Sequence, residues 1–127
     1  YRAQHGLRAL VYSGTAAKAA QIQALYNLTH FTHGHANDQY PEPADRLRAA
    51  GHQYEPTLYY TTYNREVCVQ MQQTGARYIP LLDSMIMRAY RESAAHNEAL
   101  LDPTVRLVGT ATLWDGWEVQ NTIVLCI

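Results

Sequence analysis

The segment from Tyr90 to His96 has the residue types and the spacing most suited to chemistry. Tyr90, Ser93 and His96 follow one another at intervals of three residues. In an α-helix, side chains at such intervals lie roughly on one face, so we expect these three to line one wall of a groove. His96 is a candidate ligand there, although a histidine hydrogen-bonded between a helix and a sheet fits the pattern equally. Ser93 has no acid or base partner within the segment, and we interpret it as a small packing residue rather than a nucleophile.

Histidine is the residue type that could hold a metal ion. The chain contains six, and three of them form the cluster His30-x-x-His33-x-His35 at the start of a polar loop over residues 30–43. This spacing belongs to no standard zinc site, and several histidines of such a loop can simply be solvated. From the residues alone, the loop is either a metal site or a solvated polar segment.

The two cysteines, Cys68 and Cys126, lie in apolar segments of β-strand character. One interpretation is two small buried thiols without reactivity. The other is a disulfide between neighbouring strands, which export of the domain would favour. Two cysteines do not fix a cellular compartment, so both interpretations stay open. In either case we expect the two residues on neighbouring strands of one sheet.

Length and composition limit the class of protein. We assign residues 1–127 to one domain, because this length supports a single sizeable core. The net charge of −1 gives no basic surface for nucleic acid. No apolar run approaches the ~20 residues of a membrane-spanning helix, and the start has no signal-peptide pattern. Because the chain opens inside what reads as a helix, we expect an excised or processed domain whose first helix lacks its N-terminal part.

The periodicity of apolar residues predicts an α+β chain. Alanines and other apolar residues favour a helix over residues 15–27 that packs closely against a sheet. In Asp45-Arg46-Leu47 we expect Leu47 in the core and Arg46 paired with a carboxylate or a carbonyl. Asp115-Gly116 is typical of a hairpin turn. The other expected elements are a short helix over 43–51, one or two strands within 57–71, a turn over 72–78, a long helix from 83 or 84 to about 101, and strands over 104–112 and 117–127.

Five segments, in sequence order, resemble the CAP superfamily of cysteine-rich secretory, antigen 5 and pathogenesis-related 1 proteins, whose domain is also called SCP. The segments are Tyr1–Leu10, Phe31–Gly34, Asp45–His52, Tyr90–Pro103 followed by Val108-Gly109, and Gly116–Asn121. The order aromatic-x-x-Ser-x-x-His is similar to the bacterial branch. Members of that branch usually have Trp where this chain has Tyr90, and Pro-Gly where it has Ala94-Ala95.

The resemblance implies a three-layer α-β-α sandwich with a central, mainly antiparallel sheet. It also implies a cleft whose two histidines are His33 and His96, and some members bind a divalent metal between them. Glu66 is the nearest match to the first acidic position of this cleft, although Val67 replaces the usual Asn. Ser93 stands where other members have a second acid. We therefore expect His33 and His96 to converge across a groove, with Glu66 approaching from the sheet and Ser93 on the same wall.

Three classes of function remain open. The resemblance favours a secreted or cell-surface binding domain without an established reaction, whose cleft takes a divalent metal such as zinc, a small molecule, a lipid or a peptide. A hydrolase would use His33, Glu66 and His96, because two imidazoles and a carboxylate form an acceptable catalytic zinc set. If Glu66 is an exposed strand residue and His96 a packing residue, the chain is a structural module of a larger surface protein.

Overall fold

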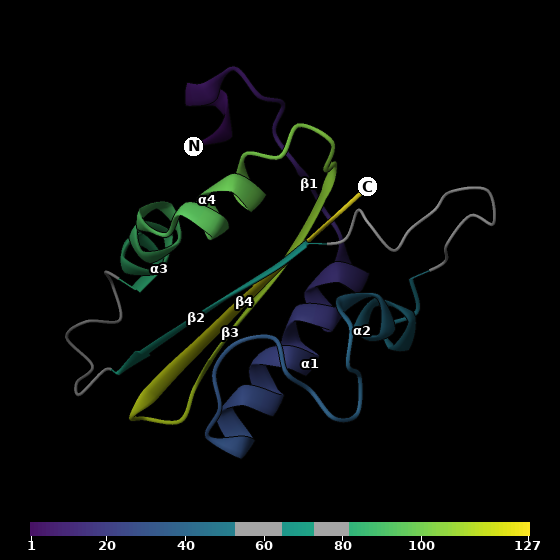
Figure 1. Cartoon of the computed structure of the whole chain (residues 1–127), viewed down its shortest axis with the longest axis vertical. Coiled ribbons are helices and arrows are strands. Elements are labelled where there is room, and N and C mark those ends of the chain that lie inside the picture. Colours follow the sequence, from purple (N-terminus) through teal and green to yellow (C-terminus); the bar gives the residue numbers. More distant parts are fainter. Residues whose placement is uncertain (53–64, 73–81) are drawn as a thin grey trace.

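The computed structural model describes residues 1–52, 65–72 and 82–127, and these residues form three layers (Figure 1). The middle layer is a four-stranded sheet with the order β1-β3-β4-β2. Strand β1 runs parallel to β3, and the other neighbours are antiparallel. The strands are β1 (Val11–Tyr12), β2 (Arg65–Gln72), β3 (Leu107–Trp114) and β4 (Glu118–Cys126). The predicted α+β sandwich with a mainly antiparallel sheet is confirmed.

Helices cover both faces of this sheet (Figure 1). One face carries α1 (Gly14–His30) and α2 (Pro43–Ala49), and the other carries α3 (Leu82–Glu92) and α4 (Ala94–Leu100). A short 3-10 helix, η1 (Arg2–His5), precedes β1. None of the helices in the described ranges is both long enough and apolar enough to cross a membrane.

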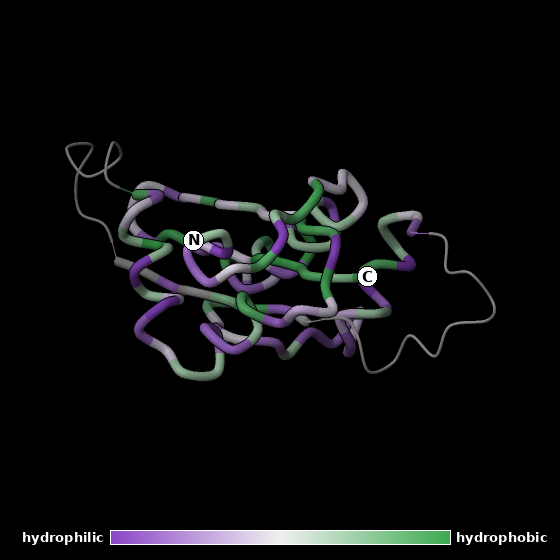
Figure 2. The backbone as a smooth tube through the Cα atoms, turned by 90° about the horizontal axis from the view of Figure 1, so that it is seen from above, coloured by the Kyte–Doolittle hydropathy of each residue, from purple (hydrophilic) through white to green (hydrophobic). Residues whose placement is uncertain are grey.

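Strand β4 separates two hydrophobic clusters, because its successive side chains point to opposite faces of the sheet. Val124 and Cys126 pack with alanines of α1 and with Leu47 of α2. Ile123 and Leu125 pack on the other face with residues of α3 and α4. Both faces of β4 are therefore buried. In Figure 2 the segment that leads to the C-terminus is coloured as hydrophobic and runs through the middle of the molecule. Leu47 lies in the core, as predicted.

Helix α1 and strand β3 approach closely at Gly109. Ala16, Ala19 and Ala20 are fully buried, so small side chains let the helix lie against the sheet. A methyl group at Gly109 would lie 1.9 Å from the backbone nitrogen of Ala17. The backbone of the helix, rather than the conformation of Gly109 itself, therefore requires glycine at this position.

Two expectations about secondary structure differ from the structure. The prediction of a single long helix from 83 or 84 to about 101 is wrong. Ser93 has extended dihedral angles, φ −90° and ψ 118°, and separates α3 from α4. Strand β1 was not expected, and it consists of only two residues beside β3. The helices near residues 15–27 and 43–51 and the closing hairpin are confirmed. The strand residues expected before Arg65 and the turn expected after Gln72 lie outside the described residues.

The two cysteines lie on neighbouring strands, as expected, but they do not form the disulfide. Both thiols are free and buried. Cys68 pairs with Thr122, so Cys126 stands four residues further along β4. At a rise of about 3.3 Å per residue the separation is roughly 13 Å. A disulfide needs Cα atoms closer than about 7 Å. Burial raises the pKa of Cys126 to about 11, and this residue is a buried thiol of the core.

Candidate functional site

A buried ion pair joins helix α2 to strand β2. The side chains of Arg46 and Glu66 are 0% and 1% exposed. The guanidinium donates from Nε to Glu66 Oε2 at 2.8 Å and from Nη2 to Oε1 at 2.6 Å. Its Nη1 donates to the carbonyl of Tyr40. Such a two-point geometry offsets much of the cost of burying both charges. The prediction that Arg46 pairs with a carboxylate is confirmed, and Glu66 is buried rather than an exposed strand residue.

Glu66 also contacts a histidine of the loop. Its Oε1 lies 3.0 Å from Nδ1 of His35, whose side chain is half exposed. A carboxylate only accepts hydrogen bonds, so the pair assigns the proton to Nδ1 and leaves the lone pair on Nε2. The resemblance pointed to His33 as the loop histidine of the cleft. The residue that the structure brings to Glu66 is His35.

Polar side chains of α1 hold the loop that carries these histidines. Gln23 and Asn27 are fully buried. Gln23 Nε2 donates to the carbonyl groups of Gly34 and Ala36 at 2.9 and 3.1 Å, and Asn27 Nδ2 donates to that of Gly34 at 3.0 Å. The backbone on both sides of His35 is thereby fixed, which sets the direction in which its ring leaves the loop. The apolar stripe of α1 gave no sign of this role, but two amides at positions i and i+4 of an alanine-rich helix were a readable signal.

His96 approaches from α4, on the other face of the sheet. Its ring stands edge-on against Tyr90, with ring centroids 5.4 Å apart and planes at 81°. Nδ1 of His96 is buried and has no hydrogen-bond partner among the described residues. Burial, followed by the charges of His35 and His33, lowers the pKa of His96 below its usual value. His96 is therefore a neutral imidazole at neutral pH, within electrostatic reach of both loop histidines.

The approach of groups from both faces is possible because β2 is the outer strand of the described sheet. His33 and His35 come from the loop after α1, whereas His96 comes from the α3 and α4 layer. His33 is exposed, and its charge lowers the pKa of His96. Ser93 is half buried at the break between α3 and α4, and its side chain makes no capping hydrogen bond. A ligand shared by these residues stays a prediction.

Cys68 belongs to the same cluster, which was not expected. Its Sγ lies 3.8 Å from His35 Nδ1, 3.9 Å from Glu66 Oε1 and 3.6 Å from Thr122 Oγ1. Because alternate residues of a strand share a face, the two-residue interval from Glu66 to Cys68 was the available signal. Burial and the charge of Glu66 raise the pKa of Cys68 to about 12. The thiol therefore stays protonated and is no nucleophile.

One set of donors in the described part of the chain lies close enough together to hold a metal ion. Ligand atoms of His35, Glu66 and Cys68 lie within 4.8 Å of one another. This set does not fit a divalent cation, because Arg46 occupies both oxygens of Glu66 and the cation would face the guanidinium. The imidazoles of His33, His35 and His96 offer neutral ring nitrogens, which suit zinc, and His96 Nδ1 has no partner in the described structure. A carboxylate behind a histidine is also the usual outer contact of a metal-bound imidazole.

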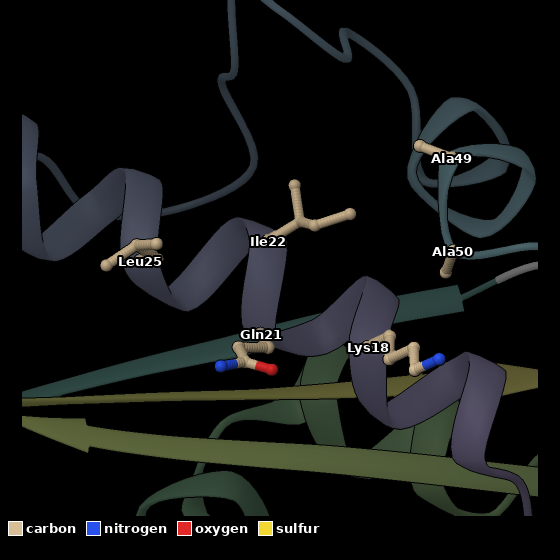
Figure 3. Close-up of a pocket in the computed structure, with 6 residues that line it drawn as sticks. All are labelled: Lys18, Gln21, Ile22, Leu25, Ala49 and Ala50. Atoms are coloured by element: carbon tan, nitrogen blue, oxygen red, sulfur yellow. The ribbon is translucent and has the colours of Figure 1, made fainter.

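A separate groove of about 320 Å³ lies between α1 and the end of α2 (Figure 3). Ile22 and Leu25 on α1 and Ala49 and Ala50 at the end of α2 supply its apolar lining. Lys18 supplies the only charge among the lining residues. This groove contains no histidine, carboxylate or thiol, so the candidate site is the histidine cluster and not this surface.

A family model described as "CAP: Cysteine-rich secretory protein family" matches residues 1–126. An outer surface protein from Borrelia burgdorferi has a TM-score of 0.66 at 17% identity, covering 98% of this chain and 83% of that chain. An extracellular protein containing a SCP domain from Bacillus anthracis also has a TM-score of 0.66, at 16% identity, covering 96% of this chain and 36% of that chain. No curated protein matches the sequence.

The two solved structures are too distant in sequence to show more than a shared fold. The family model, in contrast, spans nearly the whole chain. The chain belongs to the cysteine-rich secretory protein family, CAP.

Proposed function

We propose that this CAP domain acts outside the cell or on the cell surface, and that its cleft binds a divalent metal such as zinc through His33, His35 and His96. The proposed location is supported by the two structural neighbours, one named an outer surface protein and the other an extracellular protein. A small molecule, a peptide or a lipid headgroup with a carbonyl or anionic oxygen would bind at the same cleft. Zinc, when bound, supplies a Lewis acid for that oxygen.

The observation that carries this proposal is the buried, unpartnered Nδ1 of His96. A buried polar atom without a hydrogen bond costs about 1–3 kcal/mol, and a ligand that pairs with it recovers that cost. The charges of His35 and His33 lower the pKa of His96, so both loop histidines lie within electrostatic range of its ring. Three neutral imidazoles are an accepted zinc ligand set in proteins.

Binding is favoured over hydrolysis because neither Glu66 nor Cys68 is available for catalysis. Arg46 donates to both oxygens of Glu66, which makes Glu66 a weak candidate for a general base. Burial keeps Cys68 protonated, so it offers no covalent chemistry. Among the described residues of the cluster, the imidazoles alone keep nitrogen lone pairs for a ligand.

Calorimetric titration of chelator-treated protein with zinc and with magnesium tests this proposal. We expect zinc to bind at one site and magnesium not to bind, because imidazole nitrogen suits zinc and oxygen ligands suit magnesium. His35→Ala and His96→Ala should each weaken zinc binding by at least about tenfold. His30→Ala is the matched control, because His30 is exposed and stacks on Tyr26 with ring centroids 4.0 Å apart. Equal zinc affinity in all four proteins, or none in the wild type, would refute the metal site.

A further inference from the structure

We propose that Arg46 and Glu66 are positioning residues, which hold His35 in a single tautomer with its Nε2 lone pair available to a ligand. The consequence for metal binding rests on the proposed function, whereas the tautomer itself does not. In this arrangement Glu66 contacts no ligand. It acts through His35, and Arg46 acts through Glu66.

The orientation of the Glu66 carboxylate is fixed by two hydrogen bonds from Arg46 and by the strand that carries the residue. Arg46 Nε holds Oε2 at 2.8 Å, and Arg46 Nη2 holds Oε1 at 2.6 Å. Strand β2 carries the residue, and the two backbone partners of Glu66 and Cys68 on β4 are Val124 and Thr122. A carboxylate gripped at both oxygens by a planar guanidinium cannot rotate, because rotation would break the two-point contact.

The fixed carboxylate then selects the tautomer of His35. Oε1 lies 3.0 Å from Nδ1 and can only accept, so the proton of the neutral ring resides on Nδ1. A histidine side chain in water places its proton mainly on Nε2, so the protein reverses the intrinsic preference. The half-exposed ring consequently presents an unprotonated Nε2. Carboxylate contacts of this kind orient metal-binding histidines and raise their basicity.

Replacing both Arg46 and Glu66 separates a positioning role from a role in stability alone. A buried pair exchanged for apolar residues of similar volume usually leaves stability unchanged or raises it. The double variant Arg46→Met/Glu66→Met therefore removes the acceptor for His35 without leaving a buried charge. If Arg46 and Glu66 position His35, the folded double variant differs from the wild type in the tautomer of His35. If the pair serves stability alone, the tautomer is the same in both.

Long-range ¹H–¹⁵N spectra of the histidine rings, recorded in chelator at one pH, provide the first measurement. Wild type should show His35 protonated at Nδ1, and the double variant should show the proton at Nε2. Arg46→Lys keeps Glu66 and a cation, so it should retain the wild-type tautomer. Amide spectra establish that each variant is folded. A double variant in which His35 keeps its proton on Nδ1 would overturn the positioning role.

Zinc titration of the same proteins provides the second measurement. We expect the double variant to bind zinc about 10- to 100-fold more weakly than wild type, as for loss of other outer contacts of metal ligands. Arg48→Met is the matched control, because Arg48 is exposed on the same helix and pairs with Asp45. Wild-type zinc affinity in the folded double variant overturns the inference. A wild type that binds no zinc overturns the proposed function alone, and the tautomer comparison still decides the positioning role.

Discussion

Tyr90 and His96 remain in edge-on contact although the helix between them is broken at Ser93. The Tyr90 ring is fully buried, and its hydroxyl lies 2.6 Å from Oδ1 of Asn121 on β4. The aromatic residue is therefore anchored to the sheet at its polar end, while its ring contacts the imidazole of His96. Replacing Tyr90 with Phe removes the contact with Asn121 and keeps the ring beside His96.

Tyr90→Phe should lower the free energy of unfolding by about 1–3 kcal/mol, because Asn121 Oδ1 would stay buried without this donor. Chemical denaturation of the variant and the wild type measures the difference. Tyr12→Phe is the control, since Tyr12 is 70% exposed and should change stability little. Equal stabilities of the Tyr90 variant and the wild type would show that the buried hydroxyl contributes nothing.

Gly109→Ala should destabilise the protein by about 1–3 kcal/mol or more, since the added methyl group meets the backbone of Ala16 and Ala17 at 2.1 and 1.9 Å. Gly14→Ala is the matched control, because nothing lies within 4 Å of a methyl group there. Thermal unfolding should show a clear loss for the first variant only. If both variants melt alike, helix α1 does not approach β3 as closely as described.

Arg46→Met alone should cost about 3–5 kcal/mol, because it leaves the Glu66 carboxylate buried without its cation. Arg48→Met on the same helix should cost less than about 1 kcal/mol, because its pair with Asp45 is exposed to solvent. Denaturation by urea compares the two. A loss of similar size at both positions would contradict the burial of the Arg46–Glu66 pair.

The metal-free protein should lose stability as the pH falls below about 6.5, and His96 should contribute to that loss. Its pKa is lower in the folded protein, so the unfolded chain binds a proton first. The stabilisation is complete above the unfolded value and disappears as the pH falls through the folded value. In chelator, melting temperatures of His96→Gln should depend less on pH in this range, and those of His30→Gln should follow the wild type.

The sequence predicted the architecture well because its signals are local. The alanine stripe of α1, the Asp115-Gly116 turn and the apolar run of β4 each specify an element without reference to distant residues. The break at Ser93 was the exception. Relatives usually have Pro at the position of Ala94, and Pro suits the first turn of a helix. This chain has the break without Pro, and Tyr90 on one side of it contacts His96 on the other.

The site was less predictable because it depends on which loop residue reaches the sheet. The loop sequence presents His33 and His35 as equivalent, and the resemblance favoured His33. The choice is made by Gln23 and Asn27, which hold the carbonyl groups beside His35, and these contacts link residues that no local pattern connects. The prediction of a disulfide was wrong for a similar reason. The apolar segments predicted that the two strands are neighbours, but they did not predict the register, which separates Cys68 from Cys126.

X-ray absorption at the zinc edge is the decisive measurement for the proposed metal site, because it identifies the atoms that hold the metal. After zinc is added to chelator-treated protein, the account predicts a first shell of imidazole nitrogen at about 2.0–2.1 Å that loses intensity in His35→Ala and His96→Ala. A sulfur shell at about 2.3 Å would place the metal at Cys68 instead. That result, or a spectrum unchanged by either histidine substitution, would contradict the account.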